Sequence, residues 1–222
     1  MNKKNMVKMG LSLGLVGALG VGATLAMLTD KTKDLTNTFA LSTKGINITL
    51  DEEDVTNPSQ RTQTGNNYGE LLSGDVRKKD PTVTVEKDSL NANIFVKVTN
   101  PNGNALTYDV TNIGDGKQWL DVTADVDPAA PEGTKYYVYM SGQGNKEEGD
   151  TYSVVETSTN DQKLTPVFNE ITVADFDNDT KPKLKNIVVR AAAVQADHVT
   201  DEEALAKAVE LLNSVEQTTE TE

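Results

Sequence analysis

The chain has 222 residues, a formal net charge of −13 and no cysteine, and these facts exclude several classes of protein. Nucleic-acid binding needs lysine and arginine to neutralise phosphates, and 34 acids against 21 bases argue against it. Without cysteine there is no disulfide framework and no thiolate chemistry.

The first 26 residues have the layout of an export signal. A basic segment, residues 1–8, precedes a glycine-rich apolar stretch at 9–23. Thr24-Leu25-Ala26 then offers small residues, so we expect a signal peptide at 1–26 that a signal peptidase cuts between Ala26 and Met27. The alternative is an uncleaved anchor, because the apolar stretch is nearly long enough to span a bilayer. Only in that case would the chain contact a membrane, through its leader.

Beyond residue 27 the apolar residues recur mostly with a period of two, which is typical of half-buried β-strands. The segment 39–50 alternates in this way, and the polar segment 51–69 is expected to be a loop. Further strands are expected at 82–85, 93–100, 105–110, 117–122, 135–140, 151–156, 166–173 and 186–195. The turn at 101–104 predicts a hairpin between 93–100 and 105–110. The nearly all-apolar run 187–194 predicts a strand covered on both faces.

One helix is predicted near the C-terminus. Thr200 and Glu203 have the spacing of a capping box. The apolar residues that follow at helical spacing are Leu205, Ala208, Val209 and Leu212. The pattern therefore predicts an all-β fold, an antiparallel sandwich or barrel over 27–199, with an amphipathic helix at 200–214 docked on it. Residues 215–222 are expected to be a disordered acidic tail.

The sequence offers no catalytic constellation. Its one histidine, His198, stands alone in a loop, so neither a zinc site built from several imidazoles nor a Ser-His-Asp triad is indicated. We therefore expect no enzyme activity, no catalytic residue and no cofactor.

Two acidic segments are candidates for cation binding. Asp175, Asp177 and Asp179 alternate like the start of a calcium loop, but the glycine and glutamate of an EF-hand are missing. We interpret them as a polar turn and assign no metal, with a looser calcium site as the alternative. The run 51–54 is interpreted as a solvated stretch of charge at the end of a strand.

Several motifs in the first 50 residues occur together. They are Lys3-Lys4, the segments 9–14 and 22–26, Thr29-Asp30, and Asn37-Thr38-Phe39-Ala40 leading into the strand at 45–50. This arrangement resembles the TasA/camelysin family of exported Gram-positive proteins, which a dedicated signal peptidase processes. Later segments resemble that family more diffusely, namely Ser73-Gly74-Asp75, Lys78-Lys79 with Val83-Thr84-Val85, 94–98 and 193–196. The resemblance implies a jelly-roll-like β-sandwich and a biofilm-matrix or cell-surface fibre subunit.

A mechanism of assembly follows as a hypothesis. The freed segment 27–41 would pair with a sheet edge of the next subunit and so build a filament. The candidate strand residues are Asn37, Thr38, Phe39, Ala40 and Leu41. The alternative is that these residues form the first strand of their own sandwich, and both arrangements could hold in turn.

The expected function is therefore that of a secreted structural protein of the extracellular matrix or cell surface. Its partners would be copies of itself or related matrix subunits. Two other classes stay open: an adhesin-like surface binding module, and a secreted camelysin-like metallopeptidase, against which the single histidine argues.

Overall fold

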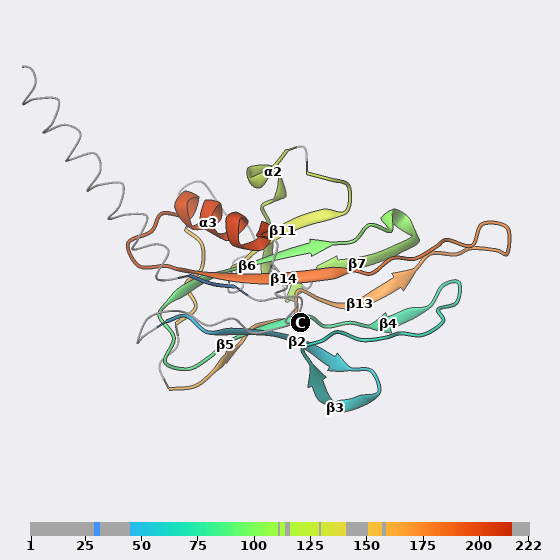
Figure 1. The fold of residues 1–222 in the computed structure, drawn as a ribbon, viewed down its shortest axis with the longest axis horizontal. Coiled ribbons are helices and arrows are strands. Elements are labelled where there is room, and N and C mark those ends of the chain that lie inside the picture. The colour runs from blue at the N-terminus through green and yellow to red at the C-terminus, as the bar shows by residue number, and fades with distance from the viewer. Residues whose placement is uncertain are drawn as a thin grey trace, which may run out of the picture.

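The computed structural model describes residues 29–31, 45–110, 112–113, 116–128, 130–140, 151–156 and 159–214. Their strands surround a common core, and a helix covers the outer face of the largest sheet (Figure 1). Every strand pair in these ranges is antiparallel. The predicted antiparallel β-sandwich with a C-terminal helix is confirmed.

The first layer is a five-stranded sheet in the order β1-β14-β6-β11-β10. Its strands are β1 (Thr29–Lys31), β14 (Val188–Gln195), β6 (Ala92–Thr99), β11 (Thr134–Tyr139) and β10 (Trp119–Asp121). The pairing of β14 with β6 is its longest, from Val188 opposite Thr99 to Gln195 opposite Ala92. This long pairing fixes β14 in the sheet independently of its other neighbour, β1.

Two smaller sheets supply the opposite side of the core. One has the order β12-β5-β2-β3 and the other β4-β13-β7. Their strands are β12 (Gln162–Lys163), β5 (Thr82–Val85), β2 (Ile48–Asp54), β3 (Asn57–Thr62), β4 (Val76–Lys78), β13 (Phe168–Val173) and β7 (Leu106–Val110). A two-stranded ribbon of β8 (Asn112–Ile113) and β9 (Gly116–Lys117) and the short helices η1 (Gly103–Ala105) and α2 (Thr123–Val126) complete the connections.

The strand β14 separates two apolar clusters, because successive side chains of a strand point to opposite faces. Ala191 and Ala193 belong to the core between the sheets. Ala192 and Val194 belong to a second cluster beneath the helix α3 (Asp201–Asn213). All four are fully buried, so the prediction that this strand is covered on both faces is confirmed.

The helix α3 begins where the sequence predicts. The Thr200 hydroxyl accepts a hydrogen bond from the Glu203 N–H, and the Thr200 N–H donates to the Glu203 carboxylate at 2.9 Å. The fully buried residues of the helix are Ala204, Ala208 and Leu212. Of the predicted apolar stripe, Leu205 and Val209 are only half-buried, so the contact face is rotated slightly toward Ala204.

Three local predictions are wrong. The segment 51–69 is not a loop throughout, because β2 extends to Asp54 and turns into β3, with the Asp54 carboxylate accepting from the Thr56 and Asn57 N–H groups. The segment 151–156 is not a strand and contributes only one isolated bridge, from Val155 to Ala92.

The third wrong prediction is the hairpin between 93–100 and 105–110. β7 pairs with β13 rather than with β6, whose two edges are already occupied by β14 and β11. The buried Asn100 amide donates to the Leu106 carbonyl at 2.6 Å and so holds the chain where it leaves the first sheet. No helix within the described ranges is both long enough and apolar enough to cross a membrane.

Candidate functional site

The N-terminal strand β1 lies on the edge of the five-stranded sheet. Thr29 pairs with Val194, Asp30 with Ala193 and Lys31 with Ala192, all antiparallel. β1 has three residues and β14 has eight, so β1 covers only part of the edge of β14. Residues 29–31 therefore form an edge strand of their own sandwich here, whereas the strand expected from the sequence, at 37–41, lies outside the described residues.

Several predicted site residues lie outside the described residues. These are the cleavage-site pair Ala26 and Met27, and the strand candidates Asn37, Thr38, Phe39, Ala40 and Leu41. The signal peptide at 1–26 and the tail at 215–222 also lie outside them.

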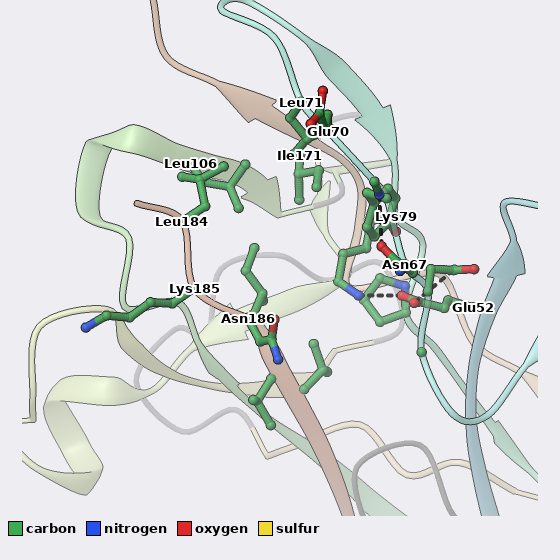
Figure 2. A pocket seen from close by; sticks show the side chains of 18 of the residues that line it. Glu52, Asn67, Glu70, Leu71, Lys79, Leu106, Ile171, Leu184, Lys185 and Asn186 are labelled. Atoms are coloured by element: carbon green, nitrogen blue, oxygen red, sulfur yellow. Dashed lines mark hydrogen bonds and ion pairs between the residues drawn. The ribbon is translucent and has the colours of Figure 1, made fainter. Parts of the chain in front are cut away.

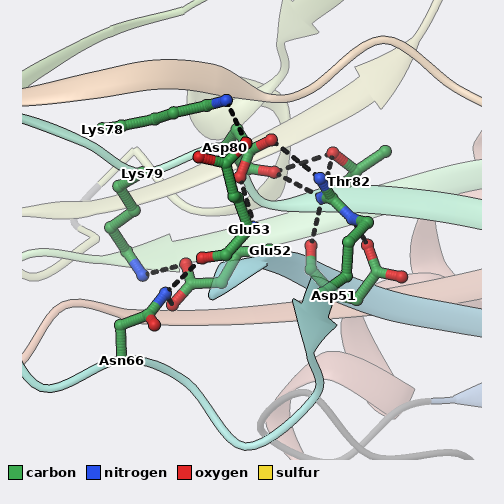
Figure 3. A network of polar contacts seen from close by, with 9 residues as sticks. Asp51, Glu52, Glu53, Asn66, Lys78, Lys79, Asp80 and Thr82 are labelled. Atoms are coloured by element: carbon green, nitrogen blue, oxygen red, sulfur yellow. Dashed lines mark hydrogen bonds and ion pairs between the residues drawn. The ribbon is translucent and has the colours of Figure 1, made fainter. Parts of the chain in front are cut away.

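The acid run 51–54 is not a solvated stretch of charge, and that interpretation is wrong. Glu52 is fully buried and its carboxylate lies 2.5 Å from the Lys79 ammonium, itself buried. The Asn66 amide donates to the second Glu52 oxygen at 2.9 Å (Figure 3). The neighbouring Glu53 pairs with Lys78 nearer the surface.

An arginine binds the other side of the same network. The Arg61 guanidinium contacts the Asp51 carboxylate at 2.5 Å and the Asp80 carboxylate at 2.8 Å. It also donates to the Asp51 and Asp80 carbonyls and to the Thr82 hydroxyl. Partial burial alone would lower the pKa of Arg61, but the bonds to the two carboxylates outweigh it, and the pKa is raised. These contacts join β2, β3 and β5 across their polar end.

Next to this network lies a pocket of about 920 Å³ between the loop 64–71 and the segment 181–189 (Figure 2). Its apolar wall is made by Leu71, Leu106, Ile171, Phe176, Leu184 and Ile187. Its polar side holds the Glu52–Lys79 pair, which Figure 2 places across from Lys185 and Asn186. Glu70 and Lys181 also line it, so the pocket is an open cleft with one apolar wall and an otherwise polar lining.

Tyr68 gives the pocket an unsatisfied polar group. Its hydroxyl oxygen is buried and has no hydrogen-bond partner within the described residues. The nearby Asn66 amide donates instead to Glu52 and to the Glu53 carbonyl. Burial, with the negative charge of Glu52 as a second cause, raises the pKa of Tyr68, so its hydroxyl keeps its proton.

Within the described residues, no hydrogen bond or ion pair joins the predicted acidic turn to the Glu52–Lys79 pair. The Asp177 carboxylate accepts from the Asp179 and Thr180 N–H groups and from the Thr180 hydroxyl, which lowers the pKa of Asp177. Asp175 lies 3.5 Å from the Ser73 hydroxyl. Within the ranges that the structure describes, no three histidine, aspartate or glutamate side chains gather as a metal site requires. His198 is exposed, at a backbone φ of 63°.

Sequence reasoning missed Glu52, Lys79 and Tyr68, although one signal was available for Glu52. Ile48 and Leu50 alternate toward the core, and the same period of two places Glu52 on the buried face. The alternation of the strand therefore indicated that the Glu52 carboxylate is buried, whereas the four consecutive acids at 51–54 indicated that it is exposed to solvent. Nothing local in the sequence indicates that Lys79 is the partner of Glu52, 27 residues away.

The comparisons with known proteins leave the family open. No protein-family model matches the chain, and no curated protein or solved structure matches it significantly. The structural class is an antiparallel β-sandwich with an outer helix, a three-residue N-terminal edge strand and a pocket bordered by a buried ion pair.

Proposed function

We propose that this chain is an exported structural protein that forms fibres at the cell surface or in the extracellular matrix. Copies are joined when the N-terminal strand moves from its own sheet to that of a neighbour. The observation that supports this most directly is the pairing of β1 with β14, since it places an N-terminal strand on a sheet edge.

The short pairing of β1 makes exchange inexpensive. A ladder of three residue pairs forms on the order of three hydrogen bonds, each contributing roughly 1 kcal/mol net. The pairing of β14 with β6 does not involve β1, and the side chains of Ala192, Ala193 and Val194 belong to the apolar clusters on the two faces of the sheet. The vacated edge therefore remains a template for an identical strand. Leaving the edge costs little, and replacing the strand from another copy recovers the same bonds.

Head-to-tail exchange of β1 would build a filament, whereas reciprocal exchange between two copies would close a dimer. Residues 32–47 join β1 to β2, and a chain of that length spans up to roughly 50 Å when extended. We propose the head-to-tail arrangement, in which each copy gives its strand to the next copy and receives one from the copy before it. Burial of Phe39 on the neighbour would add roughly 2 kcal/mol per contact.

Deletion of residues 27–40 tests the proposal. The deleted chain should stay monomeric and show no filaments by negative-stain electron microscopy under conditions where residues 27–222 assemble. Deletion of the acidic tail 215–222 is the control and should leave filaments intact. Undiminished filaments after the N-terminal deletion would refute strand donation.

A surface binding module is the second candidate, and the pocket of about 920 Å³ is the observation that favours it. A protein of that class needs no assembly. Light scattering over a concentration range separates the two: a mass that stays monomeric throughout favours the binding module, and a mass that grows favours the fibre subunit.

A further inference from the structure

Three lysines gather on five residues of this acidic chain. Lys181, Lys183 and Lys185, here called the lysine ladder, are exposed and alternate with the half-buried Pro182 and Leu184. None of the three forms an ion pair within the described part of the chain. A chain with 34 acids and 21 bases has many carboxylates available, so three unpaired cations in one segment form a distinct positive surface.

The segment 181–187 continues the line of β14 beyond the end of its sheet (Figure 1). The Lys185 N–H donates to the Asn102 side-chain oxygen at 2.7 Å, and the Asn102 amide donates to the Lys185 carbonyl at 2.9 Å. One side chain thus takes the place of a neighbouring strand on that edge. The alternation of exposed and half-buried side chains is also that of an extended chain.

The opposite edge of this segment offers main-chain groups. In an extended chain, successive residues direct their N–H and C=O groups to alternate edges, so those of Leu184 and Asn186 face away from Asn102. Neither residue has a main-chain hydrogen-bond partner within the described ranges. An extended chain with free main-chain groups on one edge is the acceptor for an added strand.

The pocket lies beside the same segment. Leu184, Lys185 and Asn186 line it, together with the apolar Leu106 and Ile171. Figure 2 shows the Lys185 side chain extending away from the other labelled residues, while its backbone borders the pocket. Added side chains on the Leu184 face would therefore lie against the apolar wall of the pocket, and those on the lysine face would meet cations.

We propose that the segment 181–187 binds an extended acidic peptide as an added β-strand. Carboxylates at every second position of the peptide lie on the lysine ladder, whose members repeat at the roughly 6.6 Å spacing of alternate strand residues. Apolar side chains at the other positions enter the pocket, near the unsatisfied Tyr68 hydroxyl. This binding does not depend on fibre formation, because β1 and the edge of β14 that it covers at 192–194 take no part in it.

The probe is a fluorescein-labelled octapeptide in which glutamate alternates with leucine and valine, titrated with residues 27–222 and followed by fluorescence anisotropy. Lys181→Gln/Lys185→Gln should weaken binding roughly fivefold to tenfold, as expected for two exposed ion pairs. The matched control is Lys87→Gln/Lys163→Gln, which removes the same charge from exposed lysines elsewhere and should change binding less than about twofold.

Backbone methylation separates strand addition from simple charge attraction. Two further probes carry N-methyl groups on the odd or on the even residues of the same peptide. Only one edge of an added strand bonds to its neighbour, so one methylated probe should lose binding and the other should keep it. Equal binding by both methylated probes would overturn the proposal, because it would show that the lysines attract any polyanion without main-chain hydrogen bonds. Equal loss in the two lysine variants, or no binding of the unmethylated probe, would overturn it as well.

Discussion

Lys79→Met should strongly destabilise the fold, because it leaves the fully buried carboxylate of Glu52 without its cation. Removing one partner of a buried ion pair typically costs about 3–5 kcal/mol, since the remaining charge stays desolvated. The Asn66 amide alone does not neutralise that charge. For a domain of this size the loss corresponds to a fall in Tm of roughly 10 °C.

The double variant Glu52→Leu/Lys79→Met removes both charges. Apolar residues of similar volume in place of a buried pair are often neutral or stabilising, so we expect stability within about 1 kcal/mol of the original chain. The surface control is Lys135→Met, which breaks the 3.0 Å ion pair between Lys135 and Asp121. Both side chains are about half exposed, so this variant should lose less than about 1 kcal/mol of the free energy of unfolding.

Urea unfolding at pH 7 measures all three variants through one reporter. Trp119 is the only tryptophan, is buried, and donates its indole N–H to the Thr165 carbonyl at 3.0 Å. Its fluorescence should change when the core opens. If Lys79→Met cost no more than Lys135→Met, the Glu52–Lys79 pair would be solvated and the account of the polar network would be refuted.

Two further predictions concern backbone geometry and the helix cap. Gly133→Ala should lower the free energy of unfolding by about 1–3 kcal/mol more than Gly69→Ala. Both glycines have positive φ, but only at Gly133 would a Cβ lie 2.0 Å from the Asn100 carbonyl oxygen. Equal losses of the two variants in urea unfolding would contradict this. Thr200→Ala should cost about 1 kcal/mol through loss of the cap. Hydrogen bonds from Thr200 hold the pKa of Glu203 below its usual value, so the part of the cap's contribution that the Glu203 carboxylate makes is present above about pH 4.3 and is lost as pH falls through the lowered pKa. A Glu203 titration by NMR at the ordinary glutamate pKa would contradict it.

The sequence predicts the strands best where one face is buried. Alternating apolar residues place β5, β6, β11, β13 and β14 within a few residues of their observed bounds. The helix α3 is equally visible, because its cap and its apolar spacing both lie within 13 residues. These signals are local, so they need no knowledge of the partner.

Strand partners could not be predicted in the same way. A turn after β6 does not reveal that both edges of β6 are taken by strands distant in the sequence, and so β7 was assigned to the wrong neighbour. β3 was missed because it is polar and nearly all exposed, with Pro58 within it. The pocket depends on segments about 115 residues apart, the loop 64–71 and the segment 181–189, which only the folded structure brings together.

The central claim is that β1 pairs within one copy before assembly and between copies in the fibre, and an engineered disulfide tests it most directly. Thr29 and Val194 are opposite one another, and the chain has no other cysteine to compete with Thr29→Cys/Val194→Cys. Oxidation of the monomer should lock β1 in place and abolish filaments, and reduction should restore them. Oxidation after assembly should give a ladder of covalent multimers on a non-reducing gel. Filaments that form normally from the locked monomer, or that yield only intramolecular cross-links, would contradict the claim.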